Sequence, residues 1–184
     1  MKTRAASWLA APALWLVLQC ACAAMPATVP AHIAAALPDA HLAGSGTYRW
    51  FGIRVYDAEL WVGPRGYQAD AAPFALDLRY GHNFSGKKIA EHSAVEIDKL
   101  GIGNAEQHRN WLDKMQACFP DVEDGTHLTG IFHPGSGAAF YRDGKAICEI
   151  KDAQFAAAFF AIWLDPHTTA PGLRASLLGP GKQP

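Results

Sequence analysis

The chain has 184 residues, of which 50% are hydrophobic and 18% are charged, and its formal net charge at pH 7 is −1. This length and apolar fraction are sufficient for one domain with a hydrophobic core that needs no metal ion to hold it together. The basic residues are dispersed and carry no excess of positive charge, so the composition excludes a nucleic-acid-binding protein of the usual basic type.

The first 23 residues have the three parts of a secretory signal peptide. Lys2 and Arg4 precede an apolar stretch from Ala5 to Leu18, and Ala21-Cys22-Ala23 forms a cleavage box of small residues. We therefore expect cleavage near Ala23 and a mature protein that is periplasmic or secreted.

Two other interpretations of this segment remain open. A lipoprotein signal could be built around Cys20, although Gln19 stands where such signals prefer a small residue. The segment could also be an uncleaved anchor helix, although Pro12 interrupts an apolar run that is already short for a membrane span. We expect no stable membrane anchor in the mature protein.

Residues 24–40 are rich in Ala and Pro and contain little charge, which is typical of a leader arm. At most a short helical turn is expected there, around Ile33–Leu37. Residues 41–180 contain no internal repeat, and we expect them to form a single domain.

Strands are expected at the start of this domain. Alternating residue types predict two antiparallel strands between Leu42 and Val62, with a turn near Trp50–Gly52. A further strand is expected over Pro73–Tyr80, and three of its apolar side chains face the same way: Phe74, Leu76 and Leu78.

Two helices follow these strands. Ser85 can cap a helix that runs to Leu100, and Asn104 can cap a second one that runs to Phe119 and stops at Pro120. Ile89, Ser93, Ile97 and Leu100 form a stripe at helical spacing on the first helix.

Three short strands joined by tight turns come next, over Thr126–His133, Ala138–Tyr141 and Lys145–Ile150. The pair Asp143-Gly144 is the strongest local hairpin signal in the chain. We therefore predict a β-meander in this part of the sequence.

The C-terminal part is strongly apolar. Asp152 opens a helix in which Phe155, Phe159, Phe160 and Trp163 leave no wide polar face, so the helix must be buried on most sides. It is too short to span a membrane. A last helix over 170–178 completes an α+β domain with a mainly antiparallel sheet and helices packed on one face.

Loss of the signal peptide would leave Cys118 and Cys148 as the remaining cysteines. An even pair in an oxidising compartment indicates a disulfide. The alternative is that both are buried as small apolar side chains.

Three separated motifs of this chain resemble the bacterial chalcone isomerase-like domain: Phe119-Pro120-Asp121-Val122, the turn from Phe140 to Lys145, and the apolar segment Phe155–Gly179. The resemblance covers roughly residues 42–179. It implies the chalcone isomerase-like open-faced β-sandwich, in which a ligand cleft lies between the sheet and a pair of helices.

The plant chalcone isomerases share this fold. Their catalytic residues are an arginine that leads into an early strand, a threonine on the following strand, and a tyrosine, a lysine and an asparagine on the first helix. Alignment on a glycine and on a Val-Tyr pair places Ile89, His92 and Glu96 at the three helix positions. Phe51 then stands at the threonine position and Gly44 near the arginine position. Because these side chains cannot replace the plant residues, we do not expect the plant reaction.

Lys88, His92 and Glu96 follow one another at helical spacing of four residues. His92 beside a carboxylate is the catalytic candidate, as a general base, or half of a metal site. The alternative is a solvated charge ladder that supports the helix. Since no second pair of metal ligands accompanies it, we predict neither a metal nor a cofactor.

Arg54 and Tyr56 share one strand face by a period of two, together with Ala58 and Leu60. An arginine and a tyrosine facing an apolar pocket would suit a fatty-acid carboxylate, which the fatty-acid-binding relatives of this fold hold with such a pair. The alternatives are Arg49, which points the other way, and a surface ion pair of either arginine with Asp57 or Glu59. His127 and His133, which share a face of a later strand, are interpreted as structural.

Three functions remain open. The first is binding of a small amphipathic ligand, such as a fatty acid, by Arg54, Tyr56, Ile89 and His92, without catalysis. The second is an isomerase of the intramolecular lyase type that acts on an unknown substrate with His92 as the base. The third is a periplasmic interaction module that binds no ligand, and the sequence identifies no protein partner for it.

Overall fold

The structure is a computed structural model that describes residues 28–179. The predicted signal peptide lies outside the described residues, as does the first part of the leader arm. In chain order the elements are α1 (Ala31–Ala36), β1 (His41–Trp50), β2 (Ile53–Val62), β3 (Phe74–Tyr80), α2 (Gly86–Lys99), α3 (Ala105–Cys118), β4 (His127–His133), β5 (Gly137–Arg142), β6 (Lys145–Ile150), α4 (Ala153–Leu164) and α5 (Pro171–Leu178).

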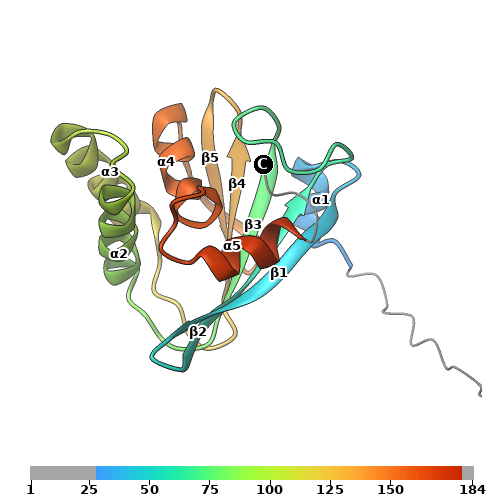
Figure 1. Cartoon of the computed structure of the whole chain (residues 1–184), viewed down its shortest axis with the longest axis horizontal. Coiled ribbons are helices and arrows are strands. Elements are labelled where there is room, and N and C mark those ends of the chain that lie inside the picture. The colour runs from blue at the N-terminus through green and yellow to red at the C-terminus, as the bar shows by residue number, and fades with distance from the viewer. Residues whose placement is uncertain (1–27, 180–184) are drawn as a thin grey trace, which may run out of the picture.

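The strands form one six-stranded sheet in sequence order, β1 to β6, with every neighbouring pair antiparallel. The helices α2 and α3 are inserted between the two central strands β3 and β4. Figure 1 shows α4 and α5 across one face of the sheet, with α2 and α3 as a pair beside α4. The α+β architecture predicted from the sequence is confirmed.

The main core lies between the sheet and α4. Phe74, Leu76 and Leu78 of β3 face this core together, as their spacing of two predicts. The apolar helix α4 buries Phe155 and Phe160 in the same core, and the ring of Phe160 meets that of Phe74 edge-on. The Asp152 carboxylate caps the first turn of α4 by accepting a hydrogen bond from the Phe155 N–H group. The prediction that this helix is buried on most sides is confirmed.

The reverse face of the sheet has a smaller core. Ile33 and Leu37, from α1 and its C-terminal end, pack against Trp61 of β2, Ala75 of β3 and Ile131 of β4. These strands are apolar on both faces, and a sheet of this kind must be covered on both. The leader arm thus contributes α1, which lies on the face of the sheet opposite the helices α2 to α5. The sequence had indicated only a possible helical turn there.

A disulfide joins Cys118, at the end of α3, to Cys148 of β6. The two Cα atoms lie 5.7 Å apart and 30 residues separate the cysteines in sequence. This separation of Cα atoms is normal for a disulfide. The bond ties the end of the helical pair to the edge strand of the sheet.

Candidate functional site

A cavity of about 540 Å³ lies between the sheet and the helices α2 and α4. Its inner wall consists of buried and mainly apolar side chains: Leu78, Tyr80, Ser93, Phe119, Leu128, Phe159 and Trp163. The lining side chains that are exposed to solvent mark what we call the opening: Trp50, Ile53, His82, Lys88 and His92.

The first turns of α2 form one wall of this cavity. The hydroxyl oxygen of Ser85 caps the helix by accepting a hydrogen bond from the Lys88 N–H group. From this start, the helical period brings Lys88, Ile89, His92 and Ser93 to the cavity side. The structure therefore brings Ile89 and His92 together at the cavity, and their part in ligand binding stays a prediction.

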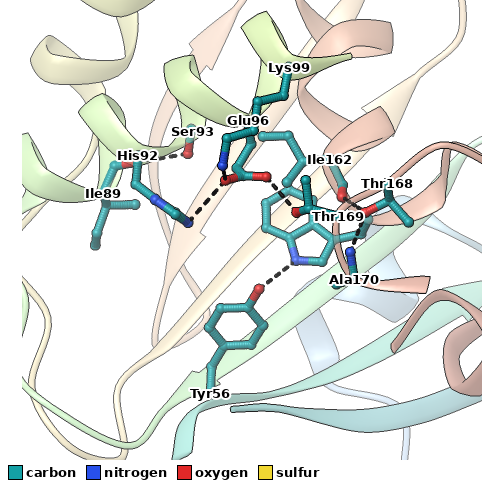
Figure 2. Close-up of polar contacts among 11 residues, drawn as sticks. Tyr56, Ile89, His92, Ser93, Glu96, Lys99, Ile162, Thr168, Thr169 and Ala170 are labelled. Atoms are coloured by element: carbon teal, nitrogen blue, oxygen red, sulfur yellow. Dashed lines mark hydrogen bonds and ion pairs between the residues drawn. The ribbon is translucent and has the colours of Figure 1, made fainter. Parts of the chain in front are cut away.

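Three tyrosines line the opposite wall. The rings of Tyr48 and Tyr56 are stacked with centroids 5.2 Å apart, and Tyr80 meets Tyr56 edge-on at 5.9 Å. The Tyr56 hydroxyl oxygen accepts a hydrogen bond of 2.9 Å from the Trp163 indole N–H group, as Figure 2 shows. Burial raises the pKa of both Tyr56 and Tyr80, so both hydroxyls keep their protons and can donate hydrogen bonds.

Tyr80 presents its hydroxyl to the cavity. The side chain is only 4% exposed and lines the cavity. Within residues 28–179, no hydrogen bond joins this hydroxyl to another group. Among the described residues, no fully buried side-chain oxygen or nitrogen lacks a hydrogen-bond partner, so the Tyr80 hydroxyl is open to the cavity and can donate to a ligand there.

Glu96 lies behind His92 and is 7% exposed. One of its carboxylate oxygens accepts a hydrogen bond of 2.7 Å from Lys99, and the other accepts one of 2.6 Å from Thr169 (Figure 2). Burial alone would raise the pKa of Glu96, but these hydrogen bonds and the charge of Lys99 outweigh it and hold the pKa below its ordinary value. Glu96 therefore joins α2 to the segment between α4 and α5.

His92 is less tightly held. Its Nε2 atom lies 3.9 Å from a Glu96 oxygen, and the side chain is 64% exposed. The imidazole therefore remains free to contact a molecule in the cavity. Of the predicted ladder of Lys88, His92 and Glu96, only the pair of His92 with Glu96 forms among the described residues. Glu96 also pairs with Lys99, which the prediction did not include.

Arg54 does not line the cavity. Tyr48 pairs with Tyr56 and Arg49 pairs with Arg54, which leaves Val55 without a partner as a β-bulge. Because the bulge adds one residue, Arg54 and Tyr56 point to opposite faces of the sheet, and the predicted common face is wrong at this point.

On its own face, Arg54 makes an ion pair of 2.7 Å with Asp57 and one of 3.3 Å with Asp124. The surface ion pair with Asp57, which the sequence left open, is therefore the arrangement that forms. Arg49 is exposed and donates a hydrogen bond of 3.3 Å to the carbonyl oxygen of Gly52. Among the described residues, no arginine lines the cavity.

Residues 24–179 match the family model of chalcone isomerase-like proteins. The chain belongs to this chalcone isomerase-like family. It is also 33% identical, over 139 residues, to an uncharacterised protein of Haemophilus influenzae, an alignment that spans 76% of this chain and 68% of that protein.

The fold is also found in a solved structure. The crystal structure of a fatty-acid-binding protein of Arabidopsis thaliana superimposes with a TM-score of 0.62 and covers 77% of this chain and 87% of the plant protein. The two chains are 11% identical, so the comparison shows a common fold. The resemblance that the three sequence motifs indicated is confirmed.

In this chalcone isomerase-like protein, the positions aligned with the plant catalytic residues are dispersed. Ile89 and His92 line the cavity, whereas Phe51 lies at the tip of the β1–β2 hairpin and is 88% exposed. Gly44 lies against α5, where an added Cβ atom would collide with the backbone of Ser176. The aligned positions therefore do not converge on one site.

Two cavity-lining tyrosines, Tyr48 and Tyr80, were not predicted from the sequence. Tyr80 continues the period of two that Phe74, Leu76 and Leu78 begin, so this pattern could have placed it on the cavity face. Tyr48 could be placed only through its pairing with Tyr56.

Residues 28–179 contain no cluster of three or more His, Cys, Asp or Glu side chains suited to a metal ion. None of the helices in this range combines the length and apolar character of a membrane span.

Proposed function

We propose that this protein binds a small single-chain amphiphile, such as a fatty acid, in the cavity and does not convert it chemically. The observation that carries the proposal is the distribution of polar groups in the cavity. Its inner wall is made mainly of buried apolar side chains, whereas its opening has the polar groups of His82, Lys88 and His92. The volume of about 540 Å³ lies within the range of ligand sites in proteins.

The orientation of the ligand follows from electrostatics. A carboxylate placed at the inner wall would lose its hydration without meeting a positive charge, which is strongly unfavourable. At the opening it meets the Lys88 ammonium group and the His92 imidazole and remains close to water. The hydrocarbon chain then fills the inner part of the cavity.

The fold is a second, independent observation in support of this proposal, because the Arabidopsis protein with the same fold is a fatty-acid-binding protein. Export belongs to the proposal as well. The sequence of residues 1–23 predicts a signal peptide, and a disulfide between Cys118 and Cys148 is compatible with an oxidising compartment such as the periplasm.

The test is native mass spectrometry of protein isolated from the exporting cells, followed by titration with a fluorescent fatty acid. We expect co-purified lipid and saturable binding, both abolished when Ile89→Trp fills the cavity from α2. Val95→Trp is the matched control, since Val95 is 51% exposed on the same helix. A ligand-free protein that also fails to bind the added fatty acid would contradict the proposal and favour the interaction module.

A second function is favoured by the position of His92. This side chain lines the same cavity as the Tyr56 and Tyr80 hydroxyls, so a base that removes a proton and donors that stabilise an enolate oxygen face one space. If the protein is an isomerase, His92→Ala should abolish turnover of an enone or hydroxyacyl compound and leave thermal stability nearly unchanged. An equal loss of stability would indicate a structural histidine.

A further inference from the structure

The tip of the β1–β2 hairpin has an exposed apolar surface. Trp50 is 63% exposed, Phe51 88% and Ile53 54%, and the rings of Trp50 and Phe51 lie 5.0 Å apart. The remaining large exposed hydrophobic side chain of the described residues is Val95, on α2. Figure 1 shows this hairpin projecting from the lower edge of the molecule. We refer to Trp50, Phe51 and Ile53 as the hairpin tip.

The backbone of the tip does not require these side chains. Phe51 and Gly52, the two residues between the strands, both have positive φ angles, +47° and +80°. Two-residue hairpin turns of this kind favour Asn, Asp or Gly at the first position, and a bulky side chain is unfavourable there. Phe51 therefore neither helps the turn to form nor contributes to the core.

The tip is continuous with the cavity. Trp50 and Ile53 line the cavity at its opening while more than half of each side chain is exposed. Lys88 and His92 border the same opening from α2. A surface that contacts the tip would therefore also face the opening of the cavity.

The charge beside the tip is positive. Arg49 is exposed and hydrogen-bonded to the Gly52 carbonyl, without an acidic partner among the described residues. Arg54 differs, since Asp57 and Asp124 neutralise it. The tip thus combines two aromatic rings with an unneutralised guanidinium group, which is the combination that interfacial regions of anionic membranes attract.

A protein partner fits the tip less well. A stable protein interface buries about 800 Å² on each side, whereas the tip is a narrow convex loop with three apolar side chains. We propose that the hairpin tip inserts into an anionic lipid surface, which turns the opening of the cavity toward the bilayer. This goes beyond ligand binding and does not depend on it, because the tip can bind lipid whether or not the cavity holds a ligand.

The test is co-sedimentation with vesicles of phosphatidylglycerol and phosphatidylethanolamine. Every variant is expressed as the full chain in the same cells, so that processing of residues 1–23 is equal in all of them. Trp50→Ser combined with Phe51→Ser should weaken vesicle binding about tenfold or more, because each buried aromatic side chain contributes that much. Val95→Ser, which removes an exposed apolar side chain away from the tip, should leave binding unchanged.

Charge is tested separately. Arg49→Gln should weaken binding to these vesicles but not to vesicles of neutral phosphatidylcholine, and added salt should remove the difference. The proposal is overturned if the double variant binds vesicles as wild type does, or if it loses no more than Val95→Ser. It is also overturned if wild type is a dimer that the double variant dissociates while vesicle binding persists. Phe51 does not line the cavity, so the single variant Phe51→Ser is measured in both assays. It should weaken vesicle binding and leave fatty-acid binding unchanged, so the two proposals can fail separately.

Discussion

The hydroxyl oxygen of Tyr56 and the indole nitrogen of Trp163 are joined by a hydrogen bond of 2.9 Å, although 107 residues separate them in sequence. The bond crosses from β2 to α4 along the wall of the cavity. It fixes the distance between sheet and helix at this point, where side chains do not fill the space.

Tyr56→Phe should lower the free energy of unfolding by about 1–3 kcal/mol, because the buried Trp163 N–H group loses its acceptor. Denaturation with urea measures this change. In a double-mutant cycle, Trp163→Phe should cost less in the Tyr56→Phe background than in wild type. Additive effects of the two substitutions would show that the bond does not contribute to stability.

Lys88→Gln should weaken fatty-acid binding by about two- to fivefold, as expected for the loss of one exposed charge pair. Tyr80→Phe should have a smaller effect if the carboxylate lies at the opening. Titration of both variants with the same fluorescent fatty acid shows whether the carboxylate lies at the opening, beside Lys88, or at the inner end, beside Tyr80. A larger loss for Tyr80→Phe would place the carboxylate at the inner tyrosines.

Reduction of the disulfide should lower the free energy of unfolding by about 3–4 kcal/mol, because the bond closes a loop of 30 residues in the unfolded chain. Urea denaturation with and without a thiol reductant measures the difference. The double variant Cys118→Ser, Cys148→Ser serves as control and should show the lower stability under both conditions. A wild-type protein that is insensitive to complete reduction would contradict this account.

The docking of α1 should weaken in acid. The Nε2 atom of His32 lies 2.9 Å from the Thr129 hydroxyl oxygen, and that hydroxyl donates to Asp77, so His32 donates its Nε2 proton in this chain. Burial lowers the pKa of His32, and His127 lowers it further, while Asp77 opposes both. The folded protein therefore disfavours protonation of His32. The stabilisation of α1 docking by neutral His32 is complete above about pH 6.5 and is lost as the pH falls through the lowered pKa of His32.

Hydrogen exchange measures this effect, since the amides of Ala34 and Leu37 are bonded within α1 and its C-terminal end. Their protection should fall between pH 7 and pH 5. His32→Gln, which keeps a neutral donor, should make protection independent of pH in this window. If the variant and wild type respond to pH alike, His32 is not the group responsible.

Local patterns predicted most of the fold. Ser85, Asn104 and Asp152 cap the helices that they were expected to begin, because a cap acts through hydrogen bonds within one turn. The spacing of the apolar side chains in β3 and α4 likewise predicted correctly that they are buried. The site was predicted less completely: Tyr56, Ile89 and His92 line the cavity, whereas Arg54 does not.

The difference has a physical reason. The sequence by itself determined where helices and strands begin, which side chains avoid water, and that two cysteines were available to pair, since these depend on residue type and near neighbours. The bulge at Val55, which reverses Arg54, depends on how β1 pairs with β2. The cavity depends on how far α2 and α4 stand from the sheet, and the exposure of Phe51 depends on the position of the hairpin in the fold. Only packing between distant segments decided these features, because no local pattern encodes the space that several elements leave between them.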